Sequence, residues 1–315
     1  MSFKKAPGFV LGLFVISGAL LSSCSETKER PTSDFQKEII PWAGQNRVAF
    51  IHAPPAKPKH PGYTVILAFH GGTGTALSFD RITNLSALAD KESFMVVFPE
   101  GIDRKWDDGR PERHTGYDDV GFVSQLIDRL VKKYNANPGR IFATGISNGG
   151  LFTFRLACEL SDKIEGIAPV ASNMVKELSM KCTPKKSISI LNIVGDKDPL
   201  VPFIGGQITG PLAIRKLGEV LSSDATIAYW KDKGQCRSFP AAADLPPITD
   251  DDTTIRKEIH GECAWGSSIV RYIVKNGGHT WPGGVQYAKE SLIGKTTQNL
   301  DANKEIWTFF SQIAQ

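Results

Sequence analysis

Short apolar runs alternate along the chain with longer segments in which apolar residues recur every three or four positions. An apolar run of about 4 to 8 residues bounded by turn residues is typical of a buried strand, whereas the wider spacing is typical of a helix with one buried face. The expected strands are Arg47–His52, Tyr63–His70, Ser93–Phe98, Arg140–Thr144, Ile164–Val170, Ile188–Val194, Thr254–His260 and Ser268–Lys275. The expected helices are Thr75–Lys91, Asp119–Tyr134, Leu151–Cys158, Leu212–Leu221, Thr226–Lys233 and Leu300–Ile313.

This alternation of strands and helices predicts an α/β fold with a mostly parallel central sheet and helices on both faces. The run at Tyr63–His70 is almost wholly apolar, so we expect it near the centre of the sheet. Asp118 or Asp119 is available to cap the helix that follows it. The segment Pro240–Asp252 is expected to be a loop, and its run of aspartates is more typical of a solvated turn than of a metal site.

One strand–turn–helix junction carries a chemical signal. Gly145-Ile146-Ser147-Asn148-Gly149 matches the pattern G-x-S-x-G between an apolar run and a helical segment. Glycines on both sides let a serine occupy a strained turn with its hydroxyl exposed, at a helix N-terminus that favours developing negative charge. Ser147 is therefore the candidate nucleophile, although the pattern alone also fits an ordinary glycine-rich turn.

A nucleophilic serine needs a base and an acid that orients the base, and in open α/β sheets these residues follow the carboxyl ends of strands. His279 lies between glycines after the last expected strand, and it alone among the histidines gives the chain order Ser, Asp, His. Asp196 and Asp198 both follow the strand Ile188–Val194, and either fits the role of the acid.

The loop His70-Gly71-Gly72-Thr73-Gly74 follows another expected strand. Its glycines allow the backbone to approach a substrate, so we expect the N–H of Gly72 or Thr73 to form an oxyanion hole with the N–H of Asn148.

Three further residues are candidates for substrate binding: His70, Trp106 and Trp281. His70 is more typical of a structural histidine than of a catalytic base. Trp281 fits a wall of the substrate site and a packing role equally well.

The N-terminal segment is typical of a targeting signal. Lys4 and Lys5 precede an apolar stretch at 9–21, which is shorter than the about 20 residues of a spanning helix. Leu21-Ser22-Ser23-Cys24 resembles a bacterial lipobox, so residues 1–23 are expected to be a lipoprotein signal peptide and Cys24 the lipidation site. An ordinary secretory signal is the alternative. Residues 24–34 are expected to be a flexible tether and residues 35–315 a single catalytic domain.

Four cysteines remain beyond Cys24, and an even number in an exported chain suggests two disulfides, for which three connectivities exist. Neighbours in sequence give Cys158–Cys182 and Cys236–Cys263, each closing a loop worth about 3 kcal/mol in the chain-entropy model. Buried free thiols are the alternative. A Cys/His metal site is not favoured, because the paired ligand spacings are missing from the sequence.

The charge balance argues against a nucleic-acid partner. The chain has 37 basic and 33 acidic residues, a net charge of +4, and removal of residues 1–23 lowers it to +2. We find no basic stripe, internal repeat or low-complexity segment.

The motifs together resemble the polyhydroxybutyrate depolymerase and feruloyl esterase group of α/β-hydrolases, similar to carbohydrate esterase family 1. They are HGG at 70–72, WDDGR at 106–110, DDVGF at 118–122, GISNGG at 145–150, G-x-x-D-x-x-V-P at 195–202 and GHTWPGG at 278–284. The resemblance covers about residues 45–310 and implies Ser147 as nucleophile, Asp198 as acid and His279 as base, with Cys236 and Cys263 paired. Relatives often carry a cysteine or another residue in the loop at 70–74, so the second oxyanion donor stays open.

The resemblance implies a serine esterase that forms an acyl-enzyme and needs neither cofactor nor metal. Feruloyl or acetyl esters of polysaccharide and short-acyl esters are the expected substrates, and polyhydroxybutyrate or its oligomers are the alternative. A non-catalytic, lipid-anchored binding protein and a peptidase are the other readings.

Only about 17 residues, 171–187, occupy the place where many hydrolases insert a cap, so we expect no large cap domain and an open site. We expect an exported monomer that is anchored to a membrane through Cys24, in the periplasm or at the cell surface.

Overall fold

The computed structural model describes residues 1–2, 35–210, 216–237 and 241–313. The expected lipidation site Cys24, the expected tether at 24–34 and nearly all of the expected signal peptide lie outside these residues, so these calls and the domain boundaries remain predictions. Among the described helices, none is both long enough and apolar enough to cross a membrane.

A ten-stranded sheet runs through the described residues in the order β1-β2-β4-β3-β5-β6-β7-β12-β11-β10. The strands from β4 to β12 in this order are parallel, and antiparallel strands continue the sheet at both edges. The parallel strands are β4 (Met95–Pro99), β3 (Tyr63–Phe69), β5 (Ala136–Ile146), β6 (Gly166–Val170), β7 (Ser189–Gly195) and β12 (Ile269–Lys275). The antiparallel strands are β1 (Gln36–Trp42), β2 (Gln45–His52), β11 (Thr254–His260) and β10 (Ala241–Leu245), of which β1 and β10 form the two edges.

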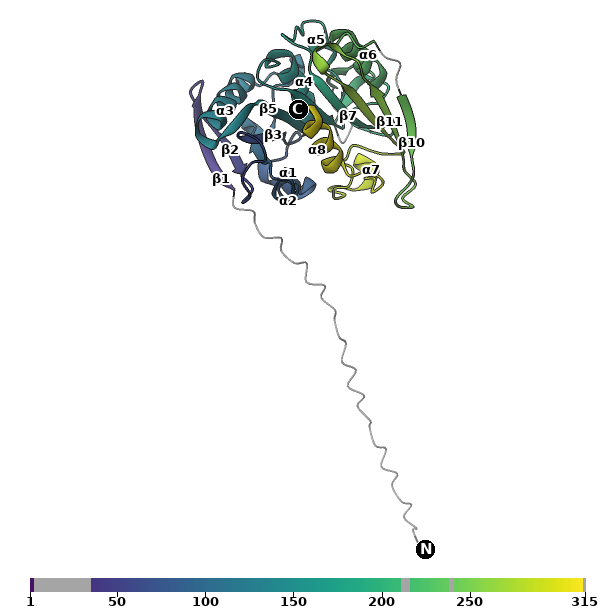
Figure 1. Cartoon of the computed structure of the whole chain (residues 1–315). Helices are drawn as coiled ribbons and strands as arrows, with labels where there is room; N and C mark the ends of the chain where they lie inside the picture. The colour runs from purple at the N-terminus through teal and green to yellow at the C-terminus, as the bar shows by residue number, and fades with distance from the viewer. Residues whose placement is uncertain (3–34, 211–215, 238–240, 314–315) are drawn as a thin grey trace. The chain divides into compact units, whose positions relative to one another are not determined.

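Alternate residues of the buried strands enter two cores on opposite faces of the sheet. In β3, Val65 and Leu67 belong to one core, whereas Ile66 and Ala68 belong to the other, as the two-residue repeat of a strand requires. Helices α3 (Asp119–Tyr134), α4 (Asn148–Glu159) and α6 (Ser223–Lys233) cover the first core (Figure 1). Helices α1 (Ala76–Thr83), α2 (Leu85–Glu92) and α8 (Ala302–Ile313) cover the second. The predicted α/β architecture is confirmed.

The predicted helix Thr75–Lys91 is wrong as a single element. It consists of α1 and α2, which meet at Asn84 in the left-handed conformation with φ 57°. The carboxylate of Asp80 accepts the backbone N–H of Ser86 at 2.9 Å and so caps the second helix. Asparagine adopts the left-handed conformation more readily than most residues. With the cap from Asp80, the chain forms two short helices instead of one long helix.

Two further predictions about secondary structure are wrong. The described part of Leu212–Leu221 contains a strand, β9 (Lys216–Val220), which pairs antiparallel with β8 (Gly206–Thr209). Gly218 has φ 93°, which an α-helix does not allow. The predicted loop Pro240–Asp252 contains β10, a largely exposed edge strand that therefore lacks an apolar pattern.

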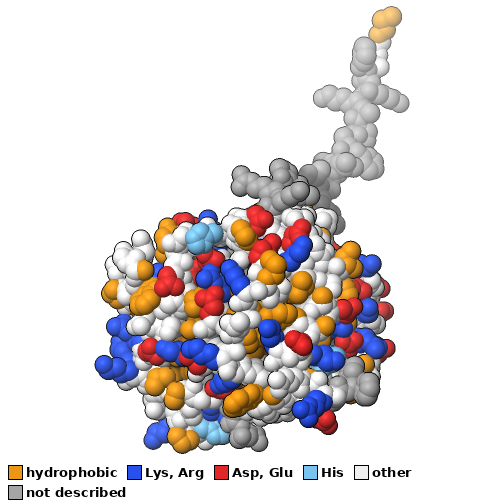
Figure 2. All heavy atoms as spheres, turned by 90° about the horizontal axis from the view of Figure 1, so that it is seen from above, with side chains coloured by type: hydrophobic (Ala, Val, Ile, Leu, Met, Phe, Trp, Pro, Cys, Tyr) orange, Lys and Arg blue, Asp and Glu red, His pale blue; other side chains and the backbone are white. Residues whose placement is uncertain are grey.

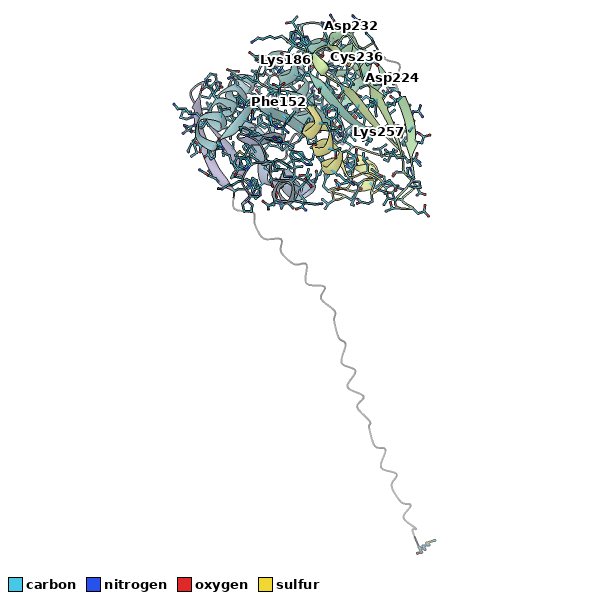
Figure 3. The ribbon with its side chains drawn as sticks, in the orientation of Figure 1. Phe152, Lys186, Asp224, Asp232, Cys236 and Lys257 are labelled. Atoms are coloured by element: carbon cyan, nitrogen blue, oxygen red, sulfur yellow. A yellow bond between two sulfur atoms is a disulfide. The ribbon has the colours of Figure 1, made fainter. Side chains whose placement is uncertain are left out.

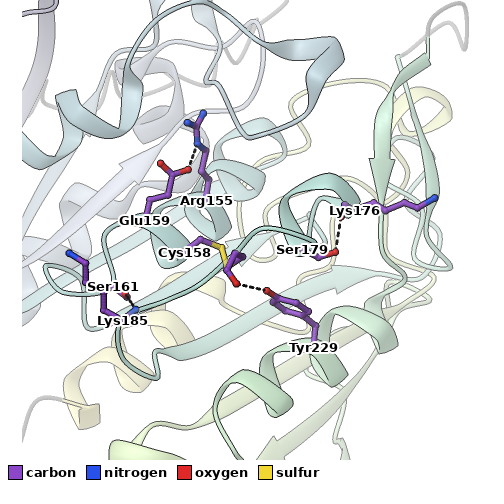
Figure 4. The surroundings of a disulfide bond; sticks show 9 residues. Arg155, Cys158, Glu159, Ser161, Lys176, Ser179, Lys185 and Tyr229 are labelled. Atoms are coloured by element: carbon purple, nitrogen blue, oxygen red, sulfur yellow. Dashed lines mark hydrogen bonds and ion pairs between the residues drawn. A yellow bond between two sulfur atoms is a disulfide. The ribbon is translucent and has the colours of Figure 1, made fainter.

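Both expected disulfides are present in the structure. Cys158 on α4 is joined to Cys182, with the Tyr229 hydroxyl donating to the Cys182 carbonyl oxygen at 3.3 Å (Figure 4). Cys236, which follows α6 and is labelled in Figure 3, is joined to Cys263. Disulfides persist in oxidising compartments, so the pair indicates export from the cytosol.

The surface mixes both signs of charge. Basic and acidic side chains are interspersed on the face seen in Figure 2. Several form pairs, such as Lys163–Asp128 and Lys185–Asp162, with N···O distances of 2.6 Å. Exposed pairs of this kind contribute about 0–1 kcal/mol each, so the folded state depends mainly on the two cores.

Candidate active site

Ser147 occupies a sharp turn between β5 and α4. Its backbone has φ 56° and ψ −125°, a conformation that costs about 1–3 kcal/mol for a residue other than glycine. A methyl group built on Gly145 would lie 2.7 Å from the Phe69 carbonyl oxygen, and one built on Gly149 would lie 2.2 Å from the same atom. Only glycine fits at these two positions, each two residues from Ser147. The turn therefore requires the G-x-S-x-G pattern.

Asp198 and His279 are hydrogen bonded. His279 Nδ1 lies 2.7 Å from Asp198 Oδ2, and both side chains are almost completely buried. The other carboxylate oxygen, Asp198 Oδ1, accepts the backbone N–H groups of Leu200 and Val201, each at 2.8 Å. Because a carboxylate only accepts hydrogen bonds, His279 donates through Nδ1, which leaves Nε2 as its proton acceptor.

Direct backbone contacts hold the two loops together. A methyl group on Gly195 would lie 2.3 Å from the Gly277 carbonyl oxygen, and one on Gly278 would lie 2.2 Å from the Ile293 carbonyl oxygen. These glycines allow the end of β7, the end of β12 and the α7 segment (Glu290–Ile293) to touch without side chains between them. The approach sets the distance between Asp198 and His279.

The hydroxyl of Tyr287 donates to the His279 backbone oxygen at 2.6 Å. Burial, followed by the nearby charge of Asp198, raises the pKa of Tyr287, so its hydroxyl remains a donor. Nothing in the local sequence identifies this contact, because it depends on how residues 285–294 fold back over the histidine.

Ser147 and His279 line the same cavity of about 370 Å³, at the carboxyl ends of the parallel strands. The Ser147 hydroxyl makes no hydrogen bond to another described residue. Catalytic hydrogen bonds are often long or misaligned before substrate binds, so the shared cavity is the relevant observation. Most other lining side chains are apolar: Phe79, Ile82, Ile146, Leu151, Leu200, Val201, Ile208, Leu217, Leu292 and Ile293.

The candidate oxyanion donors differ in availability. Asn148 is the first residue of α4, where a backbone N–H has no partner within the helix. Gly72 lines the cavity and lies beside Asn148: a methyl group on Gly72 would be 3.7 Å from the Asn148 Cβ. Thr73 is excluded as an oxyanion donor, because its N–H already donates to the Arg104 carbonyl oxygen at 2.8 Å. Asn148 and Gly72 remain the candidates.

The Asn148 side chain is fixed behind the elbow. Its Oδ1 accepts the Trp106 backbone N–H at 2.8 Å, and its Nδ2 donates to the Trp106 carbonyl oxygen at 2.9 Å and to Asp108 Oδ2 at 2.7 Å. Asp108 in turn pairs with Arg110 in the buried interior. The sequence marks these residues as a motif, yet their function in holding the elbow is visible only in three dimensions.

His70 lines the cavity, but both of its ring nitrogens are bound to the protein, which fits the structural role that the sequence favours. Its Nδ1 donates to the Gly71 carbonyl oxygen at 2.8 Å, and its Nε2 accepts the Gly101 N–H at 3.0 Å. Burial lowers the pKa of His70 to about 4, so the ring is neutral with both nitrogens engaged. It fixes the loop that carries Gly72.

The two tryptophans do not line the cavity, so their prediction as substrate-binding residues is wrong. Trp106 is fully buried, and its ring stacks on Phe152 with the ring centroids 5.2 Å apart (Figure 3 labels Phe152). Trp281 is also fully buried, donates its Nε1–H to Asn303 Oδ1 at 2.9 Å and meets the Phe79 ring edge-on. Both residues build the core beneath the site.

The β8–β9 ribbon forms part of the cavity wall, which changes the expectation of an open site. Ile208, Thr209 and Leu217 from this ribbon line the cavity. The ribbon is fixed at one point by Arg110, whose Nη1 donates to the Leu217 carbonyl oxygen at 2.6 Å. The expectation of an open site depends on residues 171–187, whereas the ribbon belongs to a later insertion.

Among the described residues, no cluster of histidine, cysteine and carboxylate groups could hold a metal ion. Within the run at 250–252, Asp251 accepts the backbone N–H groups of Thr253 at 2.9 Å and of Gln298 at 2.6 Å. Asp251 therefore ties two loops together.

Three features define an α/β-hydrolase: a parallel sheet, a serine in a strand–turn–helix elbow beside a cavity, and a histidine of the same cavity that is bound to a carboxylate. The protein is a carboxylic ester hydrolase. Residues 53–226, more than half of the sequence, match the family described as Phospholipase/Carboxylesterase. The chain belongs to this family.

Several proteins similar to this chain are named as esterases. The chain is 28% identical over 299 residues to the "Putative esterase NocK" of Nocardia uniformis subsp. tsuyamanensis, covering 90% of this chain and 85% of that protein. It is 30% identical over 223 residues to Feruloyl esterase B of Piromyces equi, where it covers 68% of this chain but only 39% of the relative. An acetyl xylan esterase from Aspergillus awamori shares the fold, with a TM-score of 0.57 at 14% identity, over 88% of this chain and 99% of that one.

Proposed function

We propose that this chain is a serine esterase in which Ser147, His279 and Asp198 act as nucleophile, base and orienting acid. The observation that carries the proposal is the buried Asp198–His279 hydrogen bond beside a cavity that Ser147 also lines. The strained turn at Ser147 adds support, because such strain is concentrated at functional sites.

In the proposed reaction, the Ser147 oxygen attacks the ester carbonyl carbon while its proton passes to His279 Nε2. The negative charge on the carbonyl oxygen is held by the N–H groups of Asn148 and Gly72, and a single such donor is worth about 10²–10³ in rate. The imidazolium proton then passes to the leaving alcohol, which departs and leaves an acyl-enzyme. Water attacks the acyl carbon with His279 again as base, which releases the acid and restores Ser147.

The proposed substrates are acetyl, feruloyl or other short-acyl esters. The relatives named esterases support this class, and the mainly aliphatic cavity is well suited to a short acyl chain. A hydroxyalkanoate ester is the alternative, since the chain is 27% identical over 137 residues to a poly(3-hydroxyalkanoate) depolymerase of Paucimonas lemoignei. Rates on p-nitrophenyl acetate, methyl ferulate and a hydroxybutyrate oligomer separate these candidates.

Ser147→Ala tests the proposal. We expect hydrolysis of p-nitrophenyl acetate to fall by about 10⁴-fold or more, because the nucleophile is lost. The matched control is Ser124→Ala on α3, which lies outside the cavity and should keep full activity. Activity of Ser147→Ala near the wild-type level, with the same thermal midpoint, would remove Ser147 from the mechanism. A wild-type protein without activity on any ester would instead favour a binding protein on a hydrolase scaffold.

We further propose that the protein is exported and anchored through a lipid on Cys24. The lipobox-like sequence and the two disulfides support export. Expression of the full chain and of Cys24→Ala in a bacterial host, followed by membrane fractionation, tests the anchor. Equal membrane retention of both proteins would contradict it.

A further inference from the structure

The groups that the proposed reaction needs fix the orientation of an ester in the cavity. The carbonyl carbon must lie beside the Ser147 oxygen, with the carbonyl oxygen near the N–H groups of Asn148 and Gly72. The leaving oxygen must lie near His279 Nε2, from which it takes a proton. The alcohol half of the ester therefore lies on the His279 side of the cavity, and the acyl half points away from His279.

The His279 side of the cavity is built by residues 285–294. The His279 N–H donates to the Ile293 carbonyl oxygen at 2.5 Å, and the Tyr287 hydroxyl donates to the His279 carbonyl oxygen at 2.6 Å. Tyr287, Leu292 and Ile293 all line the cavity. Leu292 is 40% exposed, so this apolar wall is open to solvent.

A chain of direct contacts connects the β8–β9 ribbon to the Asn148 side of the cavity. Asn148 Nδ2 donates to Asp108 Oδ2 at 2.7 Å, and Asp108 is paired with Arg110. Arg110 Nη1 donates to the Leu217 carbonyl oxygen at 2.6 Å. Leu217 therefore belongs to the Asn148 side of the cavity, through contacts that involve no residue of the wall over His279.

The two walls also belong to opposite faces of the sheet. Leu217 packs against the first core, whereas Ile82 of α1 packs against the second. The Val285 N–H donates to the Ile82 carbonyl oxygen at 3.4 Å, which joins the segment at 285–294 to α1. This segment therefore lies on one side of Ser147, and the ribbon lies on the other.

The ribbon wall is held in place at two points. The Thr209 N–H donates to the Leu200 carbonyl oxygen at 3.0 Å. A methyl group on Gly218 would lie 2.7 Å from Arg110 Cδ, so the backbone next to Leu217 rests directly on the Arg110 side chain. Leu217 cannot move aside for a longer acyl chain without losing its contacts with Arg110.

We propose that Leu217 limits the length of the acyl chain and that Leu292 binds the alcohol group. Each is then a specificity-determining residue for one half of the ester. The preferred substrate has a short acyl group on a larger alcohol, whose far end extends into solvent past Leu292. This inference rests on the proposed esterase function, because the proposed reaction orients the ester.

Two substrate ratios test it. The acyl ratio is kcat/KM for 4-nitrophenyl hexanoate divided by kcat/KM for 4-nitrophenyl acetate. The alcohol ratio is kcat/KM for hexyl acetate divided by kcat/KM for methyl acetate, measured from the acid released at constant pH. Each ratio compares two substrates of one preparation, so it does not depend on the fraction of the protein that is folded.

We expect Leu217→Ala to raise the acyl ratio about tenfold or more, because it removes a fixed obstacle, and Leu217→Phe to lower it. The alcohol ratio should be unchanged in both variants. Leu292→Ala should lower the alcohol ratio about threefold or more, because an apolar contact is lost, and leave the acyl ratio unchanged.

The matched control is Leu221→Ala. Leu221 is a partly buried leucine that packs against the same core as Leu217 but does not line the cavity, so both ratios should stay at their wild-type values. An unchanged acyl ratio in both Leu217 variants, a shift of the alcohol ratio by Leu217→Ala, or an unchanged alcohol ratio in Leu292→Ala would overturn the inference. The proposed function would survive these results, because it depends on Ser147→Ala instead.

Discussion

Asp198→Asn separates the two aspartates that follow β7 and tests the orientation of His279. In the wild type, Asp198 Oδ1 accepts two backbone N–H groups at 2.8 Å while Oδ2 accepts His279 Nδ1–H at 2.7 Å. An asparagine at this position has one accepting oxygen and one donating NH₂ group. The two backbone donors of Leu200 and Val201 require the oxygen, because the opposite orientation would leave two N–H groups unpaired at about 1–3 kcal/mol each.

The NH₂ group of the substituted side chain would therefore face His279 Nδ1 and donate to it. Nδ1 then becomes an acceptor and the ring proton moves to Nε2, the nitrogen that accepts the proton of Ser147 in the proposed mechanism. A wrong tautomer of this kind lowers kcat by about 10⁴ in a Ser-His-Asp protease, which is about 5 kcal/mol of transition-state stabilisation. We expect a loss of the same size here, with KM nearly unchanged.

The assay is steady-state hydrolysis of p-nitrophenyl acetate, with thermal unfolding measured on the same preparations. Asp196→Asn is the matched control. Asp196 Oδ1 accepts the Asn276 N–H at 2.7 Å, which an amide oxygen can replace, and Oδ2 pairs with the half-exposed Lys275 at 3.6 Å, a contact of little energy. Asp196→Asn should retain wild-type kcat. A loss of less than tenfold in Asp198→Asn, or an equal loss in both variants, would refute the assignment of the acid.

Two further predictions concern the support of the site. Burial lowers the pKa of His70 from 6.5 to about 4, so between these pH values the unfolded chain binds a proton that the folded chain does not. The free energy of unfolding should therefore fall by up to about 3 kcal/mol as the pH decreases from 6.5 to 4. Urea titrations at several pH values should show this fall in the wild type but not in His70→Gln. Parallel curves of stability against pH for the two proteins would contradict the prediction. Gly149→Ala should lower stability by about 2–3 kcal/mol and reduce activity, because its methyl group would lie 2.2 Å from the Phe69 carbonyl oxygen. Gly139→Ala is the control, since its methyl group would approach nothing closer than 3.5 Å, and an equal loss in both variants would contradict the steric argument.

The sequence predicts the parts of the fold that depend on neighbouring residues. The elbow is local, because Gly145 and Gly149 are needed within two positions of Ser147. The cap of α3 is local as well: of the two aspartates that the sequence offers, Asp118 accepts the Gly121 N–H at 2.8 Å. Buried strands are also recognised, since both of their faces are apolar.

The sequence does not predict elements that lack a local pattern of this kind. The exposed strand β10 is stabilised by pairing with β11, and pairing leaves no mark in its own residues. Thr73 is lost as an oxyanion donor because of Arg104, whose carbonyl oxygen the loop reaches only after folding. The substrate roles expected of Trp106 and Trp281 fail for a related reason: a large aromatic residue beside a catalytic motif fits a wall or a core equally well until burial is known.

The polar residues of the motif at 106–119 form a continuous support for the elbow. Arg47 Nη2 pairs with Asp119 Oδ1 at 2.6 Å, Asp119 Oδ2 accepts the Asp107 N–H at 2.8 Å, and the adjacent Asp108 accepts from Asn148 Nδ2 at 2.7 Å. All of these side chains are buried, so loss of any one leaves an unpaired polar or charged group in the interior. These contacts connect strand β2 to Asn148, the first residue of α4. The position of Asn148, a candidate oxyanion donor, is therefore fixed by a strand remote from it in sequence. Substitution of Asp108, which binds Asn148, or of Arg47, which binds Asp119, should reduce stability and activity together.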